Sequence, residues 1–217
     1  MLNADKMDEL IKKAKEMEKG SVGIKVKSRL AEFKEMNKLS AEDWFSELCF
    51  CILTANSKFQ TAFNIQNELD FKGFANLSEN EVAARIRSNK HRFHNTKAKF
   101  IVKAREHLDI KQKITDLIKN KSSGEAREWI VKNIKGIGFK EASHFLRNVG
   151  YFDLAILDRH ILNLMAEKGH IIKPKSMTPK NYVEIEKKFI ELSEEAGMKA
   201  GELDLYMWCM KTGEVMK

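Results

Sequence analysis

The sequence is poor in residues that break helices and in residues that form cross-links. Its 217 residues include only two prolines and three cysteines. Three is an odd number, and none of the cysteines stands near a histidine at the spacing of zinc ligands, so disulfides and a metal cluster are not expected. Cys49 and Cys51 lie inside an apolar run, which is typical of small core residues.

Long apolar runs are missing as well. No stretch approaches the roughly eighteen apolar residues that a membrane span requires. Residues 1–20 are too charged for a signal peptide. We therefore predict a soluble protein of the cytoplasm.

The charge is unbalanced toward the basic side. Lysine and arginine outnumber aspartate and glutamate by 39 to 31, a net charge of +8 that favours a polyanionic partner. Charge alone leaves DNA, RNA, an anionic membrane and a merely solvated lysine-rich surface as alternatives. Abundant lysine and glutamate beside only three glutamines indicate a heat-adapted source.

The apolar pattern is that of helices. Strict alternation, the mark of a half-buried strand, is not seen, and apolar residues recur at spacings of three and four, which predicts an all-α protein. Four helix starts carry capping signals, namely Ser40 with Asp43, Ser78 with Glu81, Ser122 with Glu125, and Thr178 with Pro179. The predicted helices lie near residues 5–18, 22–36, 41–55, 58–69, 79–88, 95–108, 111–119, 123–133, 139–149, 158–168, 179–193 and 200–211.

Residues 134–158, IKGIGFKEASHFLRNVGYFDLAILD, combine a Gly-x-Gly turn with an amine and a carboxylate. Gly136 and Gly138 permit a tight turn and a close approach of the backbone to a partner. The helix that follows is expected to begin with free N–H groups, whose positive dipole end favours a phosphate. An ordinary connection between two helices is the alternative.

The lysine and the aspartate of this segment suggest chemistry. A lysine attacks an electrophilic carbon as the neutral amine, and partial burial beside a helix N-terminus disfavours the ammonium. Lys140 stands in the first turn after Gly138, where these conditions apply. Asp158 begins the next helix, whose N–H groups can hold its carboxylate ionised to move a proton or to stabilise positive charge on a sugar. Taken singly, a surface lysine and an N-cap aspartate are the alternatives.

This order of hairpin, lysine and Asp-x-His resembles the helix-hairpin-helix DNA glycosylases of the endonuclease III superfamily. The segments IKGIGFK and LDRH match it through Gly136, Gly138, Lys140, Asp158 and His160. Residues 51–58, CILTANSK, are similar to a helix end in these enzymes, and residues 92–104, RFHNTKAKFIVKA, to their Tyr-Asn-x-Lys-Ala helix. The resemblance covers most of residues 40–168.

The C-terminal sequence indicates which enzymes of this superfamily the chain resembles most. The four-cysteine iron–sulfur loop of endonuclease III is missing, and the final residues, GELDLYMWCMKTGEVMK, resemble the compact 8-oxoguanine DNA glycosylases/lyases of archaea and thermophiles. The resemblance implies an all-α, two-domain fold with DNA in the cleft between the domains. Residues 40–150 would form a helical barrel domain with the hairpin, and residues 1–39 with 151–217 the second domain. It also implies a monomeric prokaryotic enzyme of the nucleoid, with no cofactor and no iron–sulfur cluster.

The resemblance also implies the reaction. Lys140 attacks C1′ of a nucleotide extruded from double-stranded DNA, expels the oxidised guanine and forms a Schiff base, from which β-elimination cuts the strand. Abasic sites are cut in the same way. Asp158 orients or deprotonates the amine, or stabilises the oxocarbenium-like state, and the sequence does not separate these roles.

Several DNA contacts follow from the same resemblance. Phosphates are expected to meet the backbone N–H groups of Gly136 and Gly138 and the side chains of His160 and Lys97. Asn56 is expected to fill the space left in the stack or to contact the orphaned base, with a helix cap as the alternative.

The hairpin of this family also binds a monovalent cation. The corresponding backbone carbonyls here belong to Lys132, Ile134 and Ile137, so the resemblance implies a cation site at these three positions.

The base pocket is expected to draw on the last helix. Asp204 and Trp208 are four residues apart and share a helical face. A carboxylate accepts hydrogen bonds from guanine N1–H and N2–H2, and an indole stacks on a purine, although a buried tryptophan and a solvated aspartate fit the pattern equally. His144 and Phe93 are further candidates, with a core histidine as the alternative for His144. The resemblance adds Lys217, expected to distinguish oxidised from normal guanine.

Two other functions remain open. An endonuclease III-like glycosylase for oxidised pyrimidines is disfavoured by the missing cysteine loop and the different tail. A non-catalytic helix-hairpin-helix DNA-binding module needs the Gly-x-Gly turn but has no use for Lys140 and Asp158 at this spacing.

Overall fold

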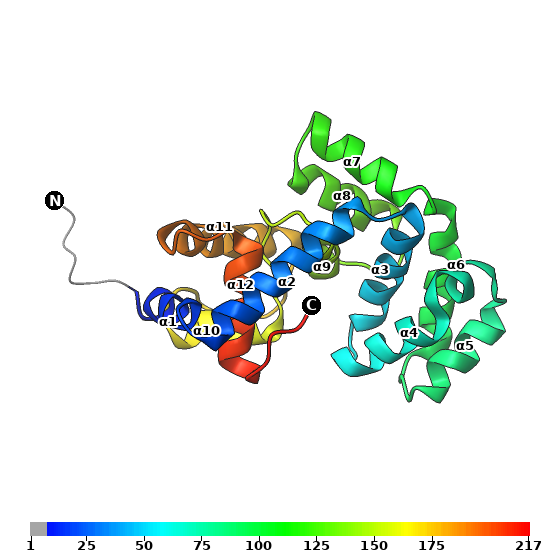
Figure 1. Ribbon diagram of the computed structural model, residues 1–217, viewed down its shortest axis with the longest axis horizontal. Helices are drawn as coiled ribbons and strands as arrows, with labels where there is room; N and C mark the ends of the chain where they lie inside the picture. Colours follow the sequence, from blue (N-terminus) through cyan, green and yellow to red (C-terminus); the bar gives the residue numbers. More distant parts are fainter. Residues whose placement is uncertain (1–7) are drawn as a thin grey trace. The chain divides into compact units, whose positions relative to one another are not determined.

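The computed structural model of the protein describes residues 8–217, whose regular structure is entirely helical (Figure 1). The predicted all-α class is confirmed. The helices are α1 (Glu9–Glu18), α2 (Ser21–Lys38), α3 (Ala41–Thr54), α4 (Phe59–Asn76), α5 (Glu79–Ser88), α6 (His94–Ala104), the 3₁₀ turn η1 (Arg105–His107), α7 (Ile110–Asn120), α8 (Ser123–Asn133), α9 (Phe139–Asn148), α10 (Arg159–Glu167), α11 (Pro179–Glu195) and α12 (Ala200–Thr212). None of these helices is both long enough and apolar enough to cross a membrane.

The predicted helix starts carry their expected caps. Ser40, Ser78, Ser122 and Thr178 each accept the backbone N–H three residues further on. At Ser40 the carboxylate of Asp43 accepts the Ser40 N–H at 2.9 Å, which completes a capping box. Such a cap contributes about 1 kcal/mol, so these helix boundaries are set by residues close in sequence.

Other boundaries differ from the prediction. The helix predicted over 58–69 continues to Asn76, with an interruption at Asp70, whose φ of 50° and ψ of −174° are not helical. The Asp70 side chain accepts the N–H of Phe71 at 2.7 Å, so the helix restarts directly after the break. The helix predicted over 95–108 ends at Ala104 and passes into η1. Residues 5–7 of the first predicted helix lie outside the described residues.

The chain divides into two compact units. We call Met36–Val149 the hairpin unit, and the residues up to Glu35 together with Gly150–Lys217 the terminal unit. Helix α3 is the centre of the hairpin unit, where it packs against α4, α6, α7 and α9. Its residues 44–53 are all buried, including Cys49 and Cys51, as predicted for core residues. A helix buried on every face is stable only inside such a core.

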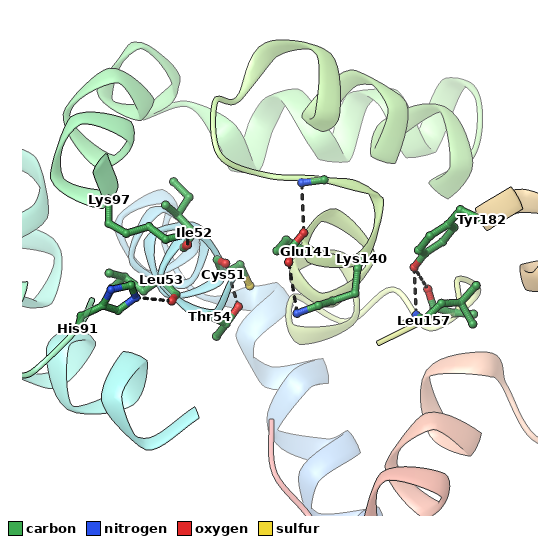
Figure 2. Close-up of polar contacts among 12 residues, drawn as sticks. Cys51, Ile52, Leu53, Thr54, His91, Lys97, Lys140, Glu141, Leu157 and Tyr182 are labelled. Atoms are coloured by element: carbon green, nitrogen blue, oxygen red, sulfur yellow. Dashed lines mark hydrogen bonds and ion pairs between the residues drawn. The ribbon is translucent and has the colours of Figure 1, made fainter. Parts of the chain in front are cut away.

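The terminal unit is built around α12, which packs against α1, α10 and α11. Two buried side chains of α11 hold the segment that precedes α10. Tyr182 donates its hydroxyl to Ala155 O at 2.8 Å and accepts the Leu157 N–H at 3.2 Å (Figure 2). Glu186 accepts the Ala155 N–H at 3.1 Å. These bonds fix the backbone immediately before Asp158.

Candidate active site

Gly136 in the turn between α8 and α9 is required by both conformation and packing. Its φ of +86° is in the left-handed region that side chains disfavour. A Cβ at this position would also lie 2.2 Å from Cδ2 of Phe100, on α6. The hairpin backbone therefore packs directly against an aromatic ring, and no larger residue fits.

Gly138 has a different role, because its N–H is already used. Gly138 is the N-cap of α9, and its N–H donates to Oε2 of Glu141 at 3.2 Å. In the free protein a carboxylate of the chain therefore accepts the N–H that is predicted to meet a phosphate. A phosphate that binds this N–H must displace Glu141.

Lys140 lies in the first turn of α9, with 27% of its side chain exposed, and its Nζ is 3.4 Å from Oε1 of Glu141 (Figure 2). Glu141 thus binds the hairpin backbone with one oxygen and the lysine with the other. Nucleophilic attack needs the lone pair of the amine, so this contact with Glu141 must be released before Lys140 reacts.

Asp158, in the terminal unit, is the N-cap of α10. Its Oδ1 accepts the N–H groups of His160 at 2.8 Å and Ile161 at 2.9 Å. The N-cap aspartate offered as an alternative is thus present. Both bonds use Oδ1, so the capping function occupies one carboxylate oxygen.

Lys97 lies inside the hairpin unit. It is 4% exposed, and its Nζ donates to Ile52 O at 2.6 Å, at the C-terminal end of α3. Burial lowers the pKa of Lys97 to about 8, an effect that Glu141 opposes and Lys140 reinforces. The predicted phosphate contact is therefore corrected: the ammonium is enclosed and bonded to the backbone.

Asn56 stands just beyond α3 with a φ of 60°, a conformation that asparagine tolerates better than most residues. Its side chain is exposed and borders a pocket of about 690 Å³. The other lining residues are Ser57, Lys58, Thr61, Asn64, Ser88, Asn89, Lys90 and Arg92. This lining contains three cations and no carboxylate, which makes the pocket electropositive.

The two candidates for the base pocket in the hairpin unit differ in exposure. Phe93 is the half-buried N-cap of α6, and the guanidinium of Arg92 lies 4.4 Å from its ring centroid. His144 is buried on α9, where its ring meets Phe50 edge-on at 5.9 Å. This placement fits the core alternative for His144.

The terminal unit brings the remaining candidates into partial contact. The rings of His160 and Trp208 meet edge-on, with centroids 5.0 Å apart. Asp204 and Trp208 both lie on α12. Asp204 is 4% exposed, whereas Trp208 is half-buried. The alternative of a buried tryptophan and a solvated aspartate is therefore wrong, because the aspartate is the more buried of the two. Lys217, the last residue of the sequence, is half-buried.

The residues of the expected cation site follow one another along the hairpin. Lys132 lies in the last turn of α8, Ile134 is the C-cap of that helix, and Ile137 lies in the turn, with both isoleucines buried. Within residues 8–217 no group of three or more histidine, cysteine, aspartate or glutamate side chains is arranged to hold a metal ion.

Comparison with known proteins identifies the family. Residues 26–198 match the family model described as 8-oxoguanine DNA glycosylase. The chain belongs to this family. A protein of Methanocaldococcus jannaschii named 8-oxoguanine DNA glycosylase/AP lyase is 44% identical over 209 residues, which cover 96% of this chain and 99% of the relative.

Solved structures of 8-oxoguanine DNA glycosylases confirm the fold. The Methanocaldococcus jannaschii enzyme in complex with a 15mer DNA containing 8-oxoguanine has a TM-score of 0.89 and 43% identity, covering 96% of this chain and 99% of that chain. A complex of endonuclease III with DNA, at 16% identity and a TM-score of 0.55, covers 86% and 84% of the two chains and shares the fold alone.

Sequence reasoning missed two residues beside the candidate site of this 8-oxoguanine DNA glycosylase family member. Glu141 stands three residues after the N-cap Gly138, which is the spacing of a capping box, so a signal was present. His91 is buried, and its ring nitrogens face Leu53 O at 3.0 Å and the Phe93 N–H at 3.1 Å. No motif marks His91, because its partner Leu53 is 38 residues away in the sequence.

Proposed function

We propose that the protein excises 8-oxoguanine from double-stranded DNA and then cuts the strand at the abasic site, as a glycosylase/lyase of base excision repair. The observation that carries the proposal is Lys140 in the first turn after the hairpin, in a chain of the 8-oxoguanine DNA glycosylase family. The Methanocaldococcus jannaschii relative, named for both activities, supports it over almost its whole length.

The proposed reaction runs through Lys140. A base inside a duplex is inaccessible, so the damaged nucleotide is first extruded. The neutral amine of Lys140 then attacks C1′, and the glycosidic bond breaks as the base leaves with its electron pair. Loss of a proton from nitrogen and opening of the sugar give the Schiff base. β-Elimination then breaks the C3′–O bond, and hydrolysis frees the lysine.

Proton transfer is assigned to two carboxylates, those of Glu141 and Asp158. In the free protein Glu141 holds the Lys140 side chain as an ion pair at 3.4 Å. Asp158 is proposed to accept the proton of the amine, or to stabilise the positive charge that develops on the sugar. Its cap bonds and the braced segment before it keep that carboxylate in a fixed place.

DNA binding is assigned to both units, which we equate with the predicted domains 40–150 and 1–39 with 151–217. The hairpin at Gly136 and the side chain of His160 contact phosphates, which positions the duplex without reading its sequence. At Gly138 the phosphate takes the N–H from Glu141. Asn56 fills the space that the extruded nucleotide leaves. The cation site of the hairpin remains part of this proposal.

Recognition of the base is assigned mainly to the terminal unit. Trp208 stacks on the purine, with Phe93 as a second stacking face, and Asp204 accepts its Watson–Crick N–H groups. The oxidised base carries an N7–H donor where guanine has an acceptor. Lys217 is assigned the distinction between this donor and the acceptor of guanine, because a polar group left unpaired in a buried site disfavours the wrong base. We further propose a monomer that needs no cofactor and acts on nucleoid DNA in a prokaryotic cytoplasm.

The proposal is tested with four duplexes, which carry a single 8-oxoguanine, a single oxidised pyrimidine, only normal bases, or a pre-formed abasic site. Base release and strand cleavage are measured separately. We expect release of 8-oxoguanine and cleavage at the abasic site, with little reaction on the other two. Preferential release of the oxidised pyrimidine would favour the endonuclease III-like alternative, and binding without any reaction would favour a DNA-binding module.

A further inference from the structure

The C-terminal end of α3 is closed by side chains from outside the helix (Figure 2). A helix leaves its last carbonyl groups without partners inside the helix. Here Lys97 donates to Ile52 O at 2.6 Å, and Nε2 of His91 lies 3.0 Å from Leu53 O. Both donors are nearly inaccessible, with exposures of 4% and 3%. The backbone that leaves α3 is thus held by α6 and by the loop before it.

His91 makes a second bond that joins this end to another segment. Its Nδ1 accepts the backbone N–H of Phe93 at 3.1 Å. An acceptor at Nδ1 places the ring proton on Nε2, the nitrogen that faces Leu53 O, so one neutral tautomer satisfies both bonds. Burial lowers the pKa of His91, which favours this neutral ring. The imidazole therefore ties the end of α3 to the start of α6.

The two segments that His91 joins carry groups around one pocket. Asn56 follows the end of α3 with its backbone at a φ of 60°. Arg92 precedes α6 and lies over the ring of Phe93 at 4.4 Å. Asn56 and Arg92 both line the electropositive pocket of about 690 Å³. The His91 bonds thus join the two backbone segments that carry these groups.

We propose that His91 is a positioning residue that holds Asn56 and the Arg92–Phe93 pair in fixed relative positions for the extrusion of the damaged nucleotide. The inference rests on the proposed function, of which extrusion is a step. Groups held in place before binding lose less conformational entropy when they distort a duplex. Removal of the His91 bonds is therefore expected to slow extrusion more than the chemistry at Lys140.

Two kinds of substrate separate these effects. A nucleotide with 8-oxoguanine must be unstacked and unpaired before attack, which costs a few kcal/mol, whereas an abasic site has no base to extract. If these groups lose their fixed positions, the rate of 8-oxoguanine excision should therefore fall, while the rate of cleavage at abasic sites should change little. A purely structural role for His91 would lower both activities together.

The variants follow from the two bonds. His91→Gln retains a donor for Leu53 O and an acceptor for the Phe93 N–H, so it is the conservative replacement. His91→Leu removes both bonds at similar volume, and His91→Asn is too short to span both partners. His107→Leu is the matched control, because His107 packs its ring against Trp129 at 5.4 Å and lies in the same unit.

Single-turnover rates are measured for 8-oxoguanine excision and for abasic-site cleavage, and extrusion is followed by the fluorescence of 2-aminopurine placed beside the lesion. We expect His91→Leu to slow excision about tenfold or more, as for the loss of an oriented hydrogen bond. Abasic cleavage should change less than about threefold. The fluorescence rise should slow with excision, and His91→Gln should restore most of the rate.

Equal losses on both substrates, or a His91→Gln variant as slow as His91→Leu, would show that His91 only stabilises the fold. Full activity of His91→Leu would also overturn the proposal. If His91→Leu does not fold, the comparison of His91→Gln with His91→Asn decides, because only the asparagine variant should lose excision selectively. Wild-type protein inactive on both substrates would instead refute the proposed function.

Discussion

The buried ammonium of Lys97 gives the protein a pH-dependent stability that the Lys97→Met variant should lack. Burial lowers the pKa of this amine from 10.5 to about 8 in the folded protein. Since the folded amine loses its proton at a lower pH than the unfolded amine, the unfolded chain binds more protons between about pH 8 and pH 10.5. The wild-type protein therefore gains stability from this group as the pH rises through that window.

The gap between the two pKa values corresponds to about 3 kcal/mol in the free energy of unfolding. Below about pH 8 the folded protein is destabilised by this full amount. Methionine has a similar length and no amine, so it removes the titration. It also leaves Ile52 O without its donor, which costs about 1–3 kcal/mol at every pH. We expect the free energy of unfolding of wild type, relative to Lys97→Met, to increase by about 2–3 kcal/mol between about pH 7 and pH 10.

The measurement is guanidinium chloride unfolding of both proteins, followed by circular dichroism at several pH values across this range. Groups that titrate in both proteins contribute equally, so they cancel in the difference between the two free energies of unfolding. A difference that stays constant with pH would show that the amine of Lys97 titrates as an exposed lysine does. A difference that falls with rising pH would reverse the sign and refute the buried-ammonium assignment.

Three further predictions concern the hairpin and the two carboxylates. Gly136→Ala should lower the free energy of unfolding by about 2–4 kcal/mol, because it adds a clash with an aromatic ring to the strain of a positive φ. The control Gly169→Ala has the same strain in open space and should lower it by about 1 kcal/mol. Equal melting temperatures of the two variants would refute the clash. Asp158→Asn keeps an oxygen for the cap, so the melting temperature should hold while single-turnover excision falls at least about a hundredfold; an unchanged rate would remove the proposed role. Glu141→Gln keeps an acceptor for the hairpin N–H but removes the ion pair that holds Lys140, so the rate of borohydride trapping at abasic sites should rise while the melting temperature holds. An unchanged trapping rate would show that Glu141 does not restrain the lysine.

The parts of the fold that the sequence predicts are those that depend on near neighbours. The capping box of Ser78 with Glu81 uses residues three apart, and both the signal and the bond are local. The interruption of α4 at Asp70 shows the limit of this reasoning. The apolar pattern correctly predicts a helix that reaches residue 69, but the restart depends on a left-handed residue that periodicity does not reveal.

The candidate site was less predictable because its partners are distant in sequence. Lys97 lies one turn before Ile101 on the buried face of α6, yet a lysine there is expected at the surface because buried charges are rare. Its acceptor, Ile52 O, is 45 residues away, so only the tertiary fold shows that the charge is bonded. The alternative of a solvated Asp204 is wrong for the same reason, since burial of a carboxylate depends on neighbours that the sequence does not identify.

The most direct test of the central claim, that Lys140 is the nucleophile, is to map the covalent intermediate. Wild-type protein is reacted with an 8-oxoguanine duplex in the presence of borohydride, and the cross-linked peptide is identified by mass spectrometry. We expect the adduct on Lys140, and none with Lys140→Gln, which should still bind the lesion. An adduct on another amine, or undiminished trapping by Lys140→Gln, would contradict the proposed mechanism.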